Sequence, residues 1–139
     1  AGLGTGGTLT GVGRKLKEHN PDIQIIAAAP EPDDTIQGLR SLEDGFIPPI
    51  LDLTVLDARL MIPSEDAFYY TKALLQEEAI FAGVSSGAAV ACAIQYAKRL
   101  SKGKIVCLLA DGGWKYLSTG LWSQEYSDLE NDVAGKVWW

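Results

Sequence analysis

The chain has 139 residues and a formal net charge of -6, and 47% of its residues are hydrophobic and 22% charged. This length and composition predict one globular domain and exclude a largely disordered chain. The acidic balance without basic runs argues against nucleic acid or an anionic membrane surface as a partner. The most apolar window, residues 81–94, is too short and too rich in Gly and Ser to span a bilayer.

The first residues carry neither Met nor the basic and apolar regions of a signal peptide. Because the chain opens inside a glycine loop, and such a loop needs a preceding strand to hold it, we expect a piece of a longer polypeptide. Two cysteines, Cys92 and Cys107, stand in apolar runs at a spacing that matches no metal or redox motif. They predict buried, reduced thiols in a cytoplasmic protein with no metal site.

Hydrophobic periodicity and helix breakers predict helices that alternate with strands. Leu9, Val12 and Leu16 share one face of a helix expected over 8–19, which Pro21 ends. Short apolar runs predict parallel strands at 23–30, 59–62, 80–82 and 104–110. Further helices are expected over 64–78, with Ser64 as N-cap, and over 88–100, with loops at 33–49, 83–87 and 111–113. This alternation predicts an α/β fold with a parallel sheet and flanking helices.

The glycine loop leads directly into the first expected helix and consists of Gly4, Thr5, Gly6, Gly7 and Thr8. Glycines allow successive backbone N–H groups to turn toward one point, and the positive end of the helix dipole favours an anion there. The two threonine hydroxyls add further donors. The loop therefore predicts a phosphate site, with a turn that only packs closely as the alternative.

The same loop also fits a dinucleotide-binding oxidoreductase domain. Gly2, Gly4 and Gly7 spell the G-x-G-x-x-G pattern. Glu31 follows the next expected strand, where an acid that binds a ribose would stand. The loop by itself leaves both phosphate ligands open.

Two further motifs follow expected strands, at the sheet edge where parallel sheets bind ligands. Residues 83–89 (GVSSGAA) form a strand–turn–helix junction, in which Ser85 or Ser86 is either a ligand contact or simply the N-cap. Residues 110–119 (ADGGWKYLST) place two glycines before a Trp and a Tyr. Lys115 in this segment is expected to pair with Asp111 rather than to take part in chemistry.

Taken in order, four motifs resemble the cysteine synthase and cystathionine β-synthase family of fold type II pyridoxal-phosphate enzymes: GTGGTLTG at 4–11, IQG at 36–38 with GFIP at 45–48, GVSSGAA at 83–89 and KYLST at 115–119. The resemblance runs from the first residue almost to the last. Residues 111–120 and 135–139 resemble a narrower group. The cysteine synthases of that group prefer O-phosphoserine and can take sulfur from a thiocarboxylated carrier protein.

The resemblance implies that this chain is part of the larger domain of such an enzyme. The glycine loop would hold the phosphate of pyridoxal 5'-phosphate, and Ser85 would meet the pyridine nitrogen. A neutral hydroxyl leaves that nitrogen largely unprotonated, which suits β-elimination and β-addition through an aminoacrylate. Gly38 and Arg40 would contact the substrate, because a guanidinium suits a phosphate better than an acetyl ester. An arginine paired with Glu43 or Asp44 is the alternative.

The resemblance also implies a division of the chain and a set of partners. Residues 1–124 would form the domain that binds the cofactor phosphate, and 125–139 a tail. In that tail Trp138 and Trp139 either close over the active site or pack on the domain surface. The family's Schiff-base lysine lies upstream of the matched motifs, so no catalytic residue is expected here and the chain alone is expected to be inactive. The full protein would be a cytoplasmic homodimer.

The implied reaction forms L-cysteine from an O-activated serine, O-phosphoserine or O-acetylserine, and sulfide or a thiocarboxylated carrier protein. A cystathionine β-synthase-type activity uses the same motifs and is one alternative. The dinucleotide-binding domain and a non-catalytic relative that acts as a sensor or scaffold are the others.

Overall fold

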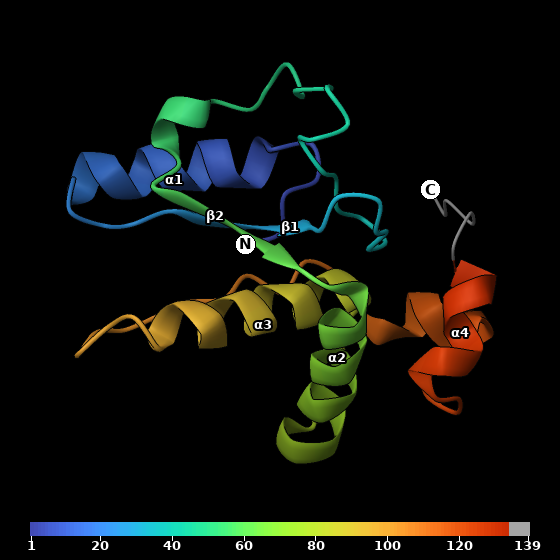
Figure 1. The fold of residues 1–139 in the computed structure, drawn as a ribbon. Coiled ribbons are helices and arrows are strands. Elements are labelled where there is room, and N and C mark those ends of the chain that lie inside the picture. Colours follow the sequence, from blue (N-terminus) through green and yellow to red (C-terminus); the bar gives the residue numbers. More distant parts are fainter. Residues whose placement is uncertain (134–139) are drawn as a thin grey trace.

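Helical elements and strands alternate in the first half of the chain, and after β2 only helical elements follow (Figure 1). A computed structural model describes residues 1–133. Its elements are α1 (Gly7–His19), β1 (Ile26–Pro30), the 3-10 helix η1 (Leu53–Val55), β2 (Ala58–Ile62), α2 (Ser64–Glu78), α3 (Val84–Ala97), the 3-10 helix η2 (Gly113–Thr119) and α4 (Tyr126–Val133). Within residues 1–133 no helix is long and apolar enough to cross a membrane.

The sheet is parallel, as expected. β1 pairs with β2 from Ile26 opposite Ala58 to Pro30 opposite Ile62. On the other side of β1, Gly2 forms a parallel bridge with Ala28. The amide of Leu3 donates to the Ala28 carbonyl at 2.8 Å, and the first three residues thus begin a third parallel row. This confirms the predicted α/β fold with a parallel sheet.

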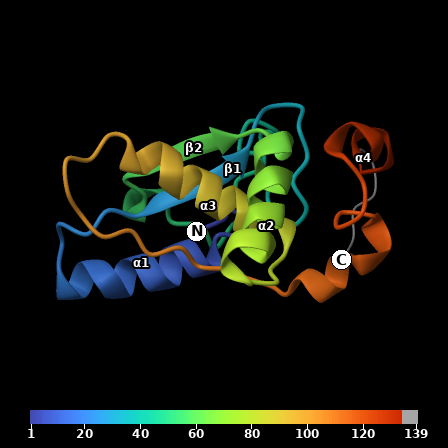
Figure 2. The ribbon, with the colours of Figure 1, turned by 90° about the horizontal axis from the view of Figure 1, so that it is seen from below.

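Helices cover both faces of the sheet: α1 lies on one face, and α2 and α3 lie on the other (Figures 1 and 2). Successive side chains of a strand point to opposite faces, so Ala27 and Ala29 pack toward α1 and Ala28 toward α3. All three alanines are completely buried. Their small side chains let helices pack closely on both faces of β1.

One predicted boundary and one predicted N-cap at helix N-termini are wrong. The turn expected over 83–87 is the first turn of α3, because the extended Gly83 serves as N-cap. α2 begins at Ser64 itself, after Pro63 as N-cap. The Ser64 hydroxyl does not cap α2 but bonds to the Tyr126 hydroxyl at 2.5 Å, and its amide donates to the Asp34 carboxylate at 2.6 Å. A carboxylate 30 residues earlier in the chain therefore holds this helix start.

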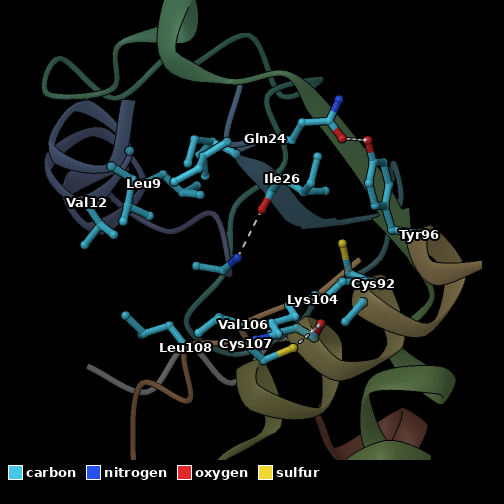
Figure 3. A pocket seen from close by; sticks show the side chains of 18 of the residues that line it. Leu9, Val12, Gln24, Ile26, Cys92, Tyr96, Lys104, Val106, Cys107 and Leu108 are labelled. Carbon is cyan, nitrogen blue, oxygen red and sulfur yellow. Dashed lines mark hydrogen bonds between the residues drawn. The ribbon is translucent and has the colours of Figure 1, made fainter. Parts of the chain in front are cut away.

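The strand expected over 104–110 does not form. Val106 is 90% exposed. Between this segment and β1 lies a cavity of about 580 Å³, which is also lined by Ala1 and by Leu9 of α1 (Figure 3). An apolar run becomes a strand only when a neighbouring strand satisfies its backbone groups, and no described segment does so here. The strand expected at 80–82 is reduced to an antiparallel bridge between Ala82 and Gly112.

The two cysteines differ in burial, because Cys107 lies in the segment beside this cavity. Cys92 is buried, as predicted, whereas Cys107 is only partly buried, because no strand of the described residues lies beside its segment. Both are free thiols, and burial raises the pKa of each. Cys107 donates a weak hydrogen bond to the Ala89 carbonyl at 3.8 Å (Figure 3).

Asp52 joins the loop before η1 to α1, and its carboxylate is expected to stabilise the fold in a pH-dependent way. It accepts bonds from the Thr54 amide at 3.0 Å and hydroxyl at 2.6 Å and from Arg14 at 2.7 Å. The Thr54 bonds, followed by Arg14, lower the pKa of Asp52 from 3.8 to about 2. The folded state therefore favours the ionised form, and its stabilising effect is present above pH 3.8 and lost as the pH falls to about 2.

We accordingly expect Asp52→Asn to lower the free energy of unfolding at pH 7, with the difference from the wild type shrinking between about pH 4 and 2. Urea unfolding of both proteins at a series of pH values measures this difference. A difference that stays constant down to pH 2 would contradict the assignment.

Candidate functional site

The glycine loop forms an open helix N-terminus with a tight backbone. Gly6 is the N-cap of α1 in the left-handed conformation, with φ of +84°, and no side chain of residues 1–133 caps the helix. The first amides of a helix have no partner within it, so those of α1 need partners from outside the helix. Among the described residues, the side-chain contact to these amides is a long one of 3.5 Å from the Gly7 amide to the Thr5 hydroxyl. Thr5 and Thr8 are exposed beside these amides.

Three residues that the sequence analysis singled out come together from separate elements. A Cβ added to Gly4 would lie 2.7 Å from the Gly38 carbonyl oxygen. A Cβ added to Gly38, whose φ is +84°, would lie 3.9 Å from Ser85 Cβ. Gly38 therefore lies between the glycine loop and the first turn of α3. The Arg40 amide, which donates to the Leu3 carbonyl at 2.7 Å, holds this loop in place.

The two serines occupy the first turn of α3. Ser85 is 8% exposed and Ser86 is completely buried. Neither hydroxyl caps α3, so the N-cap interpretation is wrong. Ser86 Oγ has no hydrogen-bond partner among the described residues. The Ser85 side chain lies near Gly38, and its hydroxyl does not cap α3.

The loop after residue 110 is tied to the start of α3. The Gly83 amide donates to the Asp111 carbonyl at 3.0 Å, and the Gly113 amide donates to the Phe81 carbonyl at 3.1 Å. Lys115 Nζ lies 4.0 Å from the Asp111 carboxylate, which confirms the expected pair. Tyr116 makes the closer contact, since its hydroxyl donates to Asp111 Oδ2 at 2.7 Å. Burial, and then this carboxylate, raise the pKa of Tyr116. The sequence analysis missed the Asp111–Tyr116 bond.

Arg40 is exposed, and its guanidinium lies 5.8 Å from the centre of the Phe46 ring. The alternative pairing with Glu43 is wrong, because Glu43 forms its ion pair with Arg59 at 2.5 Å. No ion pair of Arg40 is found among the described residues, Asp44 included. Its charge is therefore not neutralised by a carboxylate of this part of the chain.

Two further expectations concern metals and the tail. Residues 1–133 contain no group of three or more His, Cys, Asp or Glu side chains arranged to hold a metal ion. The tail expected at 125–139 begins with α4. Trp138 and Trp139 lie outside the described residues, so their two alternative placements stay predictions.

Comparison with known proteins identifies the family of this chain and the cofactor of that family. A family model described as pyridoxal-phosphate dependent enzyme matches residues 1–111. The chain belongs to this family. Pyridoxal phosphate is the cofactor of this family. The alternative that the chain is a dinucleotide-binding domain therefore loses its support.

Relatives of known name or structure agree with this family assignment. The cysteine synthase of Aquifex aeolicus is 46% identical over 130 residues, covering 90% of this chain and 40% of that protein. A probable cysteine synthase of Bacillus subtilis is 47% identical over 131 residues, covering 88% and 42%. The crystal structure of O-ureido-L-serine synthase matches with a TM-score of 0.79 and 34% identity, over 92% of this chain and 44% of that one. The chain thus spans about two fifths of its curated relatives' length.

The residues present fit a phosphate-bearing cofactor. The uncapped start of α1 offers amide donors, and the space at Gly4 is closed to any side chain by the Gly38 carbonyl. Amides at a helix start, in a loop made mostly of glycines, are suited to bind a compact anion such as a phosphate.

Proposed function

We propose that the full-length protein forms L-cysteine by β-replacement on an O-activated serine, with a sulfur compound as the second substrate. The observation that carries the proposal is the meeting of the glycine loop, Gly38 and the Ser85 turn. The two cysteine synthases that match this chain at 46% and 47% identity support it. When bound, pyridoxal phosphate supplies the electron sink that such a replacement needs.

Each part of the site has a separate task in this proposal. The amides of Gly6, Gly7 and Thr8 and the hydroxyls of Thr5 and Thr8 bind the cofactor phosphate, together with Gly4. The Ser85 hydroxyl donates to the ring nitrogen and keeps it neutral, which limits side reactions of a stronger electron sink. Gly38 lies between these two groups, so a substrate that reaches the ring passes its backbone. The Schiff-base lysine is supplied by the part of the protein upstream of this chain, and this chain alone is inactive.

We further propose O-phosphoserine as the favoured substrate, with O-acetylserine as a poorer one. Arg40 follows Gly38 by two residues, and no carboxylate of the described chain neutralises it. A guanidinium forms two parallel bonds to a phosphate but has no such contact with a neutral ester. The protein would act as a cytoplasmic homodimer, with sulfide or a thiocarboxylated carrier protein as sulfur donor.

Arg40→Ala in the full-length enzyme tests this proposal. We expect kcat/KM for O-phosphoserine to fall about 10- to 100-fold, the range for one hydrogen-bonded ionic contact, and that for O-acetylserine to change less than about 3-fold. Arg40→Lys should fall between the wild type and the alanine variant, since it keeps the charge and loses the fork. Rates of cysteine formation with each substrate measure these values.

Arg14→Ala serves as the matched control, because Arg14 is an exposed arginine of α1 that forms an ion pair with Asp52. It should leave the preference between the two substrates unchanged. An equal loss with both substrates in Arg40→Ala would refute the substrate assignment. Failure of the wild-type protein to form cysteine from either substrate would refute the proposed function.

A further inference from the structure

We propose that Asp111 and Tyr116 are positioning residues for the Ser85 hydroxyl, and that their hydrogen bond sets how well this hydroxyl meets the ring nitrogen of the cofactor. This inference rests on the proposed function. It adds a pair of residues that touch neither cofactor nor substrate but support the turn from which the contact is made.

The Asp111–Tyr116 pair lies directly against the residue that starts α3. A Cβ added to Gly83 would lie 2.0 Å from Asp111 Oδ1 and 2.6 Å from Tyr116 Cε2, so both side chains press on Gly83. The Gly83 amide is bound to the Asp111 carbonyl as well. The position of the α3 N-terminus is thus set by this pair.

The pair is itself held firmly. Tyr116 is 8% exposed, and its carbonyl accepts a bond from the Thr119 hydroxyl at 2.7 Å. Asp111 Oδ1 is buried and has no hydrogen-bond partner among the described residues. Because the Tyr116 hydroxyl is the short contact of this carboxylate, its removal leaves a poorly satisfied charge that has to move toward solvent or toward Lys115.

A movement of the Asp111 side chain would shift Gly83, and Ser85 follows Gly83 by two residues. Gly83 is the N-cap, and Ser85 stands in the first turn, where both serines are buried and cannot reorient freely. Hydrogen bonds weaken steeply as their angle and distance depart from the optimum. A shift of the turn by a few tenths of an ångström therefore weakens a bond from Ser85 without unfolding the helix.

The test compares two cofactors on the full-length protein: pyridoxal phosphate and its 1-deaza analogue, in which a C–H replaces the ring nitrogen. Both carry the same aldehyde and phosphate, so the ratio of their dissociation constants isolates the ring-nitrogen bond. We expect the wild type to favour pyridoxal phosphate about 5-fold, the equilibrium factor of one ordinary hydrogen bond. Ser85→Ala should bring this ratio close to one.

Tyr116→Phe should bring the ratio close to one as well, whereas Asp111→Asn, which keeps an acceptor for the phenol, should retain a ratio above about 2. Tyr96→Phe is the matched control, because it removes a tyrosine hydroxyl bonded to Gln24 at the other end of α3. It should keep the wild-type ratio. Thermal unfolding of each variant without cofactor records the purely structural effect.

A wild-type ratio in Tyr116→Phe, whatever its melting temperature, would overturn the positioning role and leave the proposed function standing. A wild-type ratio in Ser85→Ala would overturn the ring-nitrogen contact and the positioning role with it. No binding of pyridoxal phosphate to the wild type would instead refute the proposed function.

Discussion

Gly87→Ala is expected to lower the free energy of unfolding by about 3 kcal/mol or more. A Cβ at Gly87 would lie 2.0 Å from the Ala67 carbonyl oxygen, 2.1 Å from Thr71 Oγ1 and 2.7 Å from the Thr71 amide nitrogen. Two of these atoms belong to the backbone of α2, so a methyl group can be accommodated only by separating α2 from α3. The Thr71 hydroxyl is also bonded to the Ala67 carbonyl at 2.6 Å and cannot turn away without losing that bond.

Gly11→Ala is the matched control, since it changes a helical glycine of α1 that has no atom within 4 Å of an added Cβ. This variant should be more stable than the wild type by about 0.5–1 kcal/mol, because alanine favours the helix. Chemical denaturation of both variants gives the two values. A loss of less than about 1 kcal/mol in Gly87→Ala would show that α2 and α3 separate more easily than their contact indicates.

Gly6→Ala is expected to weaken binding of pyridoxal phosphate by at least about 10-fold. The added methyl group would lie 2.7 Å from Leu51 Cβ and 2.8 Å from Leu51 Cδ1, and Leu51 is buried. The left-handed φ of +84° costs an alanine about 1–2 kcal/mol in addition. Both effects drive the loop toward another conformation, in which the amides at the start of α1 no longer converge.

Gly45→Ala separates these two effects. Gly45 has a comparable φ of +79°, but a Cβ added there meets nothing within 4 Å. This variant should lose about the same backbone energy while it binds pyridoxal phosphate like the wild type. Fluorescence titration of the full-length protein measures both affinities. If Gly6→Ala and Gly45→Ala lost the same affinity for pyridoxal phosphate, the glycine loop would not hold the cofactor phosphate.

Local sequence signals were sufficient for several elements. The helix expected over 64–78 has those bounds, and the one expected over 8–19 begins only one residue earlier. The strand expected at 59–62 is β2. In each case the signal is short-range: apolar spacing, a Pro or Asn-Pro breaker, or acidic residues in a first turn. The glycine loop and its helix are predictable for the same reason, because a turn into a helix is built from consecutive residues.

The partners of polar side chains were not predictable in this way. Asp111 was expected to pair with Lys115, yet its shorter bond is to the hydroxyl of Tyr116, five residues further along the chain. Glu43 pairs with Arg59 and not with Arg40, for which it was one of two alternative partners. The partners of a long side chain depend on which groups the folded chain brings within its reach. These distances cannot be read from the composition.

The sequence by itself determined the family and the parallel α/β fold, since motifs and periodicity are local properties of the chain. Only the tertiary structure decided that Gly38 lies between Gly4 and Ser85, that Ser85 caps nothing, and that residues 104–110 form no strand. The reason is the same in all three cases. Backbone groups and buried side chains are satisfied by neighbours from other elements, and a strand exists only where another strand lies beside it.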